Sequence, residues 1–343
     1  MSQSGTRPYA WLEARAVRTA SDITLGCVLL AVAAAAFVGV SGMSLGTWGR
    51  PGPGFFPLVM SGLLVIAGII LVVRGAFLET PPEARWSPSG LAIIVTVVAC
   101  VNFAARAWGS ALYNLALNFG PSECVTLIAV IFAVAIALAR LSRVRAVGMA
   151  LLGLLLATIG TDVSTGTERF TLGLEQLADG LIFSVMVLGL IVVADALICV
   201  VSPSLWLAIY AREIAGRIGR QAPTIARLGL RLVAVLAIAA ACYYAFELNR
   251  AIGDVGVLVA FGLFGTTCKA LGWNRLMLLF GAYYGAIIET NISRALMLSN
   301  GDPAVFLRRP ISATLLLLAI AILTLATTCS VWRGPSKISP KGT

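Results

Sequence analysis

Apolar runs separated by short polar or glycine-rich stretches make up most of the chain. A helix of about 20 apolar residues crosses the roughly 30 Å hydrocarbon core of a bilayer. Eight runs are candidates for such crossings, covering Ile23–Val40, Phe55–Val73, Leu91–Ala105, Val125–Ala139, Ala146–Ile159, Leu181–Val201, Leu232–Phe246 and Ile311–Val331. The pattern predicts an all-α fold, a polytopic integral membrane helical bundle of about 8–10 transmembrane helices.

Two further apolar segments, Val255–Cys268 and Leu276–Ile288, are short, and both contain glycine. If each crosses the membrane, the chain has ten spans. Alternatively, the two form one re-entrant hairpin of broken helices, an arrangement that transporters use around binding sites. In both arrangements the two termini lie on the same side.

The distribution of Lys and Arg predicts the orientation, because cytoplasmic loops carry an excess of both. With the N-terminus inside, alternating spans place 18 of the 25 basic residues inside and 7 outside. Those outside are Arg50, Arg106, Arg169, Arg250, Arg294, Arg308 and Arg309. We therefore expect both termini to be cytoplasmic. The first span has no cleavage pattern and is expected to be retained.

Composition narrows the function classes. The chain is 59% hydrophobic and only 12% charged, and it contains no His. Ordinary soluble domains carry about 25% charged residues. The absence of His excludes Ser-His and Cys-His nucleophile systems and histidine metal sites. The seven Cys include no C-x-x-C pair and fit small buried apolar side chains. We expect no enzyme, metal site, cofactor or nucleic-acid partner, and we expect contact with membrane lipid.

A glycine- and proline-rich loop joins the first two spans, with four Gly and three Pro within residues 46–57. Such a segment must turn. It ends in the run Gly52, Pro53, Gly54, Phe55, Phe56 and Pro57, which places two aromatic residues at the expected membrane interface. Composition alone predicts a tight turn with an aromatic anchor. The order of residues, however, resembles the small membrane subunit of the tripartite tricarboxylate transporters (TctB type) over about residues 22–105.

A polar loop at 160–180 precedes the sixth span and contains Thr161, Asp162, Thr165 and Arg169. Its hydroxyl and carboxylate groups are suited either to capping the following helix or to coordinating Na⁺ or a proton at a broken helix end. The string resembles a signature of the large membrane subunit of the same transporters (TctA type). Residues 118–123 are similar to the start of that subunit's preceding helix.

Charged residues also fall within apolar segments, where they are costly unless they are paired or line water. Glu289, Asn291 and Arg294 follow one of the short segments, either as an ion pair or as a polar lining of the transport path. Asp195 lies in the sixth span, as a functional carboxylate or as one that reaches the cytoplasmic basic side. Residues 252–312 resemble the C-terminal end of the large subunit, so that resemblance covers about 110–330.

The resemblance implies a division into a cytoplasmic N-terminus (1–22), a small-subunit-like segment (23–105), a large-subunit-like segment (106–331) and a cytoplasmic tail (332–343). Residues 203–231 form a basic stretch, either an amphipathic helix on the cytoplasmic membrane face or a simple positively charged loop. The Pro/Gly-rich substrate loops of large subunits are missing from the chain.

In such transporters a periplasmic solute-binding protein delivers a tricarboxylate or related carboxylate to a membrane complex, and an ion gradient drives uptake. The resemblance thus implies a permease component that works with this binding protein and with other membrane subunits, coupled to Na⁺ or H⁺. The alternative is a non-transporting scaffold or a degenerate remnant of the family. Candidate substrate or ion pathway residues are Thr161, Asp162, Thr165, Arg169, Asp195, Glu289, Asn291 and Arg294.

Overall fold

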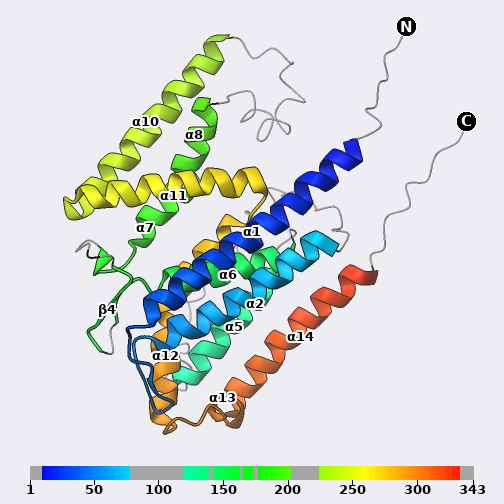
Figure 1. Ribbon diagram of the computed structural model, residues 1–343, viewed down its shortest axis with the longest axis vertical. Helices are drawn as coiled ribbons and strands as arrows, with labels where there is room; N and C mark the ends of the chain where they lie inside the picture. The colour runs from blue at the N-terminus through cyan, green and yellow to red at the C-terminus, as the bar shows by residue number, and fades with distance from the viewer. Residues whose placement is uncertain are drawn as a thin grey trace, which may run out of the picture. The chain divides into compact units, whose positions relative to one another are not determined.

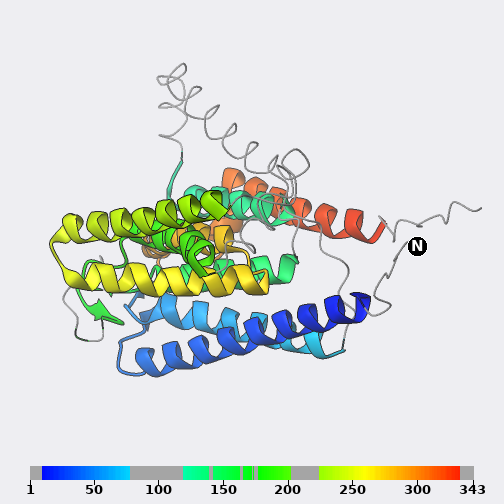
Figure 2. The same cartoon turned by 90° about the horizontal axis from the view of Figure 1, so that it is seen from above.

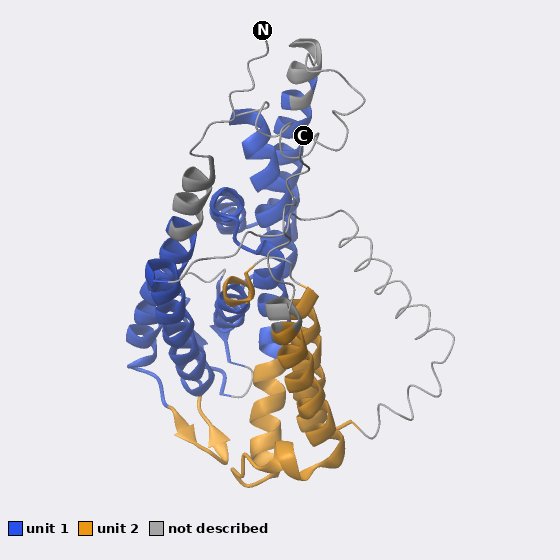
Figure 3. Cartoon of the chain, turned by 90° about the vertical axis from the view of Figure 1, so that its right-hand side faces the viewer, with its two compact units in different colours: residues 1–44, 53–80, 147–286 blue, residues 45–52, 81–146, 287–343 orange. Residues whose placement is uncertain are grey.

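The computed structural model describes residues 10–77, 119–138, 142–162, 165–171, 173, 177–201 and 224–332. The predicted span at 91–105, most of the basic stretch at 203–231 and the C-terminal tail lie outside these residues. The chain divides into two compact units (Figure 3). Unit 1 comprises Met1–Ser44, Pro53–Thr80 and Val147–Ala286, and unit 2 comprises Leu45–Gly52, Pro81–Ala146 and Ile287–Thr343.

Six helical segments of the described residues are long and apolar enough to cross a membrane. They are Ala20–Val40, Phe55–Phe77, Pro121–Leu138, Phe183–Val201, Arg231–Asn249 and Ile252–Leu271. The apolar stretch Pro310–Ala326 is shorter, as is the helix α6 (Arg143–Leu156). The all-α membrane bundle predicted from the sequence is confirmed.

In unit 1, the helices α1 (Ala10–Val40) and α2 (Phe55–Phe77) lie side by side (Figures 1 and 2). Glycine allows their close approach, since a Cβ on Gly26 would lie 2.8 Å from the carbonyl oxygen of Gly68. Leu25 and Leu64 are fully buried in this unit. Helix α6 packs on the pair where Leu29 covers Gly148.

The second part of unit 1 is built from α7 (Phe183–Val187), a π-helix η2 (Leu188–Val193), α8 (Ala194–Val201), α10 (Thr224–Asn249) and α11 (Ile252–Leu271). Val185, Ala245 and Leu258 form part of its core. The predicted sixth span is therefore helical but contains a π-helix that the sequence did not predict. The first residues of α10 fall in the predicted basic stretch and are helical.

The predicted alternative of a hairpin made from broken helices is wrong for α11 and α12 (Arg275–Leu298). Both are continuous, and α11 is long enough to cross a membrane. Its glycines are packing positions rather than breaks, because a Cβ on Gly265 would lie 2.7 Å from the carbonyl oxygen of Leu190. Gly272, with φ of +69°, ends α11 in the left-handed conformation that favours glycine.

Unit 2 pairs α5 (Pro121–Leu138) with α14 (Pro310–Trp332), seen as teal and red helices in Figure 1. The short helix α13 (Val305–Arg308) precedes α14. Strands β1 (Gly46–Thr47) and β2 (Arg50–Pro51) form an antiparallel hairpin. Gly49 of this hairpin approaches the backbone of Asn300. The predicted tight turn after the first span is this hairpin.

Both units draw on distant parts of the chain, so they cut across the segments 23–105 and 106–331, which stay predictions. The predicted burial of cysteine holds for Cys199 and Cys268, whereas Cys27 is exposed. Membrane helices direct apolar side chains outward as well as inward, so an apolar position does not predict burial.

Candidate functional site

The polar loop after α6 folds into a hairpin of its own in unit 1. Strand β3 (Gly160–Thr161) pairs antiparallel with β4 (Glu168–Arg169). The backbone N–H and hydroxyl of Thr161 both donate to the carbonyl oxygen of Ala178, at 2.8 Å each. The predicted capping of the following helix is wrong, because the N-cap of α7 is Ile182 and makes no side-chain cap bond. The loop residues instead stabilise the hairpin itself.

Asp162 is the polar centre of this hairpin. Thr165 donates its hydroxyl to Oδ2 of Asp162 at 2.6 Å, and Nη2 of Arg169 lies 3.7 Å from Oδ1. The Asp162 and Arg169 side chains are only 8% and 5% exposed. Burying two charges is costly unless both are paired and hydrogen-bonded, which is the arrangement here. The pair is therefore a fixed part of the fold.

Arg169 also joins the two motifs that the sequence analysis singled out. Its Nη1 donates to the backbone carbonyl oxygen of Pro53 at 3.0 Å. Pro53 leads into Gly54, whose N–H donates to the carbonyl oxygen of Ser44 and whose own carbonyl accepts from Leu58 at the start of α2. The hairpin is thus docked onto the connection between α1 and α2, although 116 residues separate Arg169 from Pro53.

The aromatic pair at the start of α2 serves packing more than anchoring. Phe56 is 4% exposed and Pro57 is buried, while Phe55 is half-buried. Phe56 is therefore covered by the protein itself, and the interfacial depth of the aromatic pair stays a prediction. Phe170, which follows β4, covers Gly39 on the neighbouring helix α1. A Cβ on Gly39 would lie 2.4 Å from Cε1 of the Phe170 ring. The Phe170 ring thus fills space between the end of the hairpin and α1.

Asp195, on α8, bridges two cations of unit 1. Nζ of Lys269, in the last turn of α11, lies 2.9 Å from Oδ1, and Nη1 of Arg275, at the start of α12, lies 3.2 Å from the same oxygen. The same Arg275 nitrogen donates to the carbonyl oxygen of Leu190 in the π-helix at 2.8 Å. These ties stabilise the junction of three helices. Whether Asp195 also lines a path stays a prediction.

Glu289, Asn291 and Arg294 lie on the part of α12 that belongs to unit 2. Within the described residues, Glu289 and Arg294 do not form the predicted ion pair. Five residues on a continuous helix turn the chain by about 500°, which leaves the two side chains about 140° apart. Asn291 donates to the carbonyl oxygen of Ile287 on its own helix at 2.8 Å. A polar lining remains the prediction for these positions.

Glu123 of α5, a buried carboxylate of unit 2, lies in the Tct-like residues 118–123 but was not predicted to have a role of its own. Ser122 donates its hydroxyl to Glu123 Oε2 at 2.9 Å, and Nη1 of Arg309 lies 3.4 Å away. The signal available was an acidic residue at the start of an apolar run. Its partner, 186 residues later, carries no local signal.

Comparison with known families places this geometry in context. The model of the tripartite tricarboxylate transporter TctB family matches residues 23–139, which include Pro53. The model of the tripartite tricarboxylate transporter TctA family matches residues 84–205, which include Asp162 and Arg169. The chain is related to both Tct families. The predicted resemblance to the two Tct families is therefore confirmed.

The two Tct matches differ in extent from the predicted ones. The TctB match continues to residue 139, beyond the predicted limit near 105, and the two matches share residues 84–139. The TctA match ends at residue 205, so the expected large-subunit resemblance of the C-terminal helices stays a prediction. The Arg169–Pro53 hydrogen bond therefore connects a TctA-matching loop with a TctB-matching turn.

Three relatives from Agrobacterium vitis carry uncharacterized descriptions. A 52.8 kDa protein in the TAR-I ttuC' 3' region is 43% identical over 84 residues, or 24% of this chain and 17% of that protein. A 16.3 kDa protein of the same region is 34% identical over 87 residues, or 25% of this chain and 55% of that protein. A protein in the TAR-II ttuC' 3' region is 32% identical over 81 residues, or 24% of this chain and 34% of that protein. No solved structure matches the chain.

Proposed function

We propose that this chain is a membrane permease component of a binding-protein-dependent tripartite tricarboxylate transporter. In this role it contributes to uptake of tricarboxylates or related carboxylates, driven by a gradient of Na⁺ or protons. Its partners are a periplasmic solute-binding protein and other membrane subunits of the transporter. The observation that carries the proposal is the buried contact of Arg169 with Pro53, which joins parts that match two different Tct families.

The contact favours a chain in which a small-subunit-like part and part of a large subunit act as one body. Similarity to both a 52.8 kDa and a 16.3 kDa protein of the same genomic region fits such a union. When two binding parts are linked in one chain, the effective concentration of one for the other is in the millimolar range, so the contact forms without a separate association step. A contact that would otherwise join two subunits is then internal.

An accessory role is the second candidate, and the internal pairing of the polar residues favours it. A carboxylate substrate is best held by cations whose hydrogen bonds are available to it. Arg169 is already engaged by Asp162 and Pro53, and Asp195 is engaged by Lys269 and Arg275. These residues then support the fold while another large subunit supplies the path. For Glu289, Asn291 and Arg294, a lining of the transport path stays a prediction.

The contacts within unit 1 support the proposed orientation. Segments expected inside meet one another, as where Arg74 lies 3.6 Å from Asp22 and where Trp273 donates to the carbonyl oxygen of Ser21. Segments expected outside also meet, as in the Arg169–Pro53 contact. This sorting is what an alternating topology requires. Together with the excess of Lys and Arg in the segments expected inside, it supports a bacterial inner-membrane protein with both termini in the cytoplasm.

The test is uptake of radiolabelled citrate and related carboxylates into proteoliposomes, with a solute-binding protein of the family outside. The chain is reconstituted alone and with a full-length large subunit, and Na⁺ and pH gradients are imposed separately. Uptake by the chain alone supports a permease that carries its own path. Uptake by the large subunit that increases when this chain is added supports the accessory role. Folded protein that changes uptake under neither condition overturns both.

Two substitutions distinguish residues that line a transport path from residues that only stabilise the fold. A path role predicts that Glu289→Gln and Arg294→Gln both lose uptake, and Arg294→Gln, which changes an exposed residue, is expected to do so with unchanged thermal stability. Arg308→Gln is the matched control, since Arg308 is 75% exposed and pairs with Asp302 at the surface of unit 2. Equal uptake by all three variants would contradict a path through α12.

A further inference from the structure

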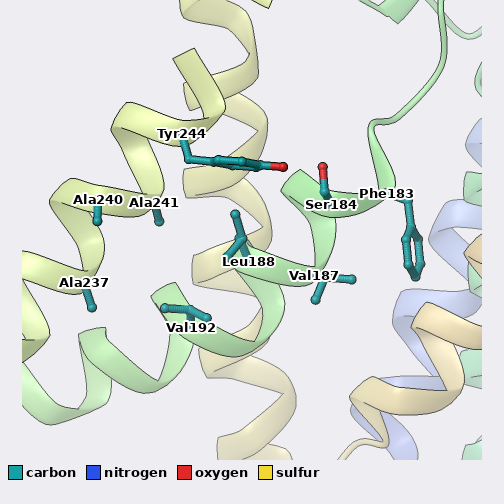
Figure 4. A pocket seen from close by; sticks show the side chains of 9 residues that line it. All are labelled: Phe183, Ser184, Val187, Leu188, Val192, Ala237, Ala240, Ala241 and Tyr244. Atoms are coloured by element: carbon teal, nitrogen blue, oxygen red, sulfur yellow. The ribbon is translucent and has the colours of Figure 1, made fainter. Parts of the chain in front are cut away.

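An open apolar groove runs along the membrane-spanning part of unit 1, between α7 with η2 on one side and α10 on the other (Figure 4). Its volume is about 650 Å³. The residues that line it are Phe183, Ser184, Val187, Leu188, Val192, Ala237, Ala240, Ala241 and Tyr244. Both walls belong to segments apolar enough to cross a bilayer, so the groove is set into the hydrocarbon region.

The two polar groups of the groove lie together at one end. In Figure 4 the Tyr244 hydroxyl is directed toward Ser184, and the Ser184 hydroxyl lies beside it in this view. Neither hydroxyl has a hydrogen-bond partner within the described part of the chain, and Tyr244 is 45% exposed. A hydroxyl without a partner is costly in an apolar medium, because hydrocarbon offers no acceptor or donor. This end of the groove therefore favours a ligand with ester or phosphate oxygens.

The length of the groove matches one leaflet of a bilayer. Eight residues separate Ser184 from Val192, which corresponds to about 12 Å along a helix. The hydrocarbon of one leaflet is about 15 Å thick, half of the 30 Å core. Ser184 is the second residue of α7, and Tyr244 lies five residues before the end of α10. The hydroxyl end is therefore near an interface, and the apolar end reaches toward the bilayer midplane.

The packing of the walls argues for a thin occupant. Helices α10 and η2 pack directly against each other, with Ala241 and Val193 in one buried core cluster, so the space left between them is narrow. A single acyl chain is much narrower than a helix. On the α10 side, the small side chains of Ala237, Ala240 and Ala241 leave space for an occupant. On the other side, Leu188 and Val192 supply apolar contact.

We propose that this groove binds one acyl chain of a phospholipid, with the hydroxyls of Ser184 and Tyr244 donating to its ester or phosphate oxygens. The lipid comes from the leaflet on the side of the β3–β4 hairpin, which directly precedes α7 in the chain. This lipid site does not depend on which carboxylate the transporter carries, and it gives unit 1 a bound lipid between α7 and α10.

Photolabelling tests the site in the full chain. The protein is reconstituted in vesicles of phosphatidylethanolamine and phosphatidylglycerol, with a trace of phosphatidylglycerol that carries a diazirine in the middle of one acyl chain. After illumination, mass spectrometry locates the labelled residues. We expect labelling of residues 184–192 and 237–244 to exceed that of the exposed apolar face of α14, which includes Leu317 and Leu325.

A variant that fills the groove is the decisive test of the lipid site. Ala240→Phe places a ring in the groove and is expected to reduce its labelling to the level of the α14 face. Ala239→Phe is the matched control, because Ala239 is exposed but does not line the groove. Tyr244→Phe removes one hydrogen bond and is expected to weaken lipid retention about two- to tenfold, measured by native mass spectrometry. Circular dichroism verifies that each variant is folded.

Three results would overturn the lipid site. One is equal labelling of the groove and the α14 face in the unchanged protein. Another is groove labelling that Ala240→Phe leaves intact. The third is loss of groove labelling when a full-length large subunit is reconstituted with the chain, which would identify a helix of that subunit as the occupant. None of these results depends on uptake, so they leave the proposed transport function unaffected.

Discussion

Replacing Arg169 by Met tests whether the buried pair holds the β3–β4 hairpin on the turn before α2. Arg169→Met keeps most of the side-chain volume but removes the bond to Pro53 and leaves the Asp162 carboxylate, 8% exposed, without its cation. At a separation of 3.7 Å the gross attraction is about 4–5 kcal/mol for an effective dielectric constant of 20. Removing one partner of a buried pair typically costs about 3–5 kcal/mol, and we expect a loss of that size.

The assay is denaturant unfolding of the purified chain in detergent micelles, followed by tryptophan fluorescence. The matched control is Arg250→Met, which breaks an exposed pair with Glu247 in which the side chains are 73% and 43% exposed. Such surface pairs contribute about 0.2–1 kcal/mol.

A double variant separates the loss of a contact from the burial of an unpaired charge. In Asp162→Leu with Arg169→Met both charges are absent, so we expect it to recover much of the stability that Arg169→Met alone loses. If Arg169→Met costs no more than Arg250→Met, or if the double variant is the least stable of the three, the reasoning from a buried pair is refuted.

Three further predictions use the same preparation or whole cells. Asp195→Asn removes the carboxylate charge that Lys269 and Arg275 share and should lower the melting temperature by several degrees, whereas an unchanged melting temperature would contradict a structural role. Gly281→Leu should prevent folding, because a Cβ there would lie 2.1 Å from the carbonyl oxygen of Ala150. Gly256→Ala, where a Cβ would meet nothing within 4 Å, should be neutral or stabilising. Size-exclusion chromatography of both variants shows whether each is folded. Alkaline phosphatase fused after Asn300 should be active and a C-terminal fusion inactive, and the reverse pattern would invert the topology.

Most membrane-spanning helices could be predicted from hydropathy alone. Within hydrocarbon every backbone N–H and C=O must be paired inside the segment, so an apolar run of sufficient length forms a helix wherever its neighbours lie. The predicted run Phe55–Val73 and the observed Phe55–Phe77 illustrate this agreement. The glycines of α11 wrongly suggested a broken helix. A continuous helix tolerates glycine where a neighbouring helix packs closely on it.

The pairing of the charged residues could be predicted only in part. An intramembrane Asp195 signalled a required partner, and the charge count placed Lys269 and Arg275 on the same side of the membrane. Nothing local identified them, since they lie 74 and 80 residues further along the chain. The π-helix that exposes the Leu190 carbonyl to Arg275 likewise has no signal in an apolar run of six residues.

Hydropathy and the order of residues were enough to predict a helical membrane protein, the position of most of its spans and the two loops with Tct-like motifs. That these loops meet through Arg169 and Pro53, and that α7 and α10 leave a groove between them, became apparent from the packed helices alone. The difference lies in the range of the interactions. Burial in hydrocarbon acts on each segment separately, whereas ion pairs and grooves depend on which distant side chains the packed helices bring together.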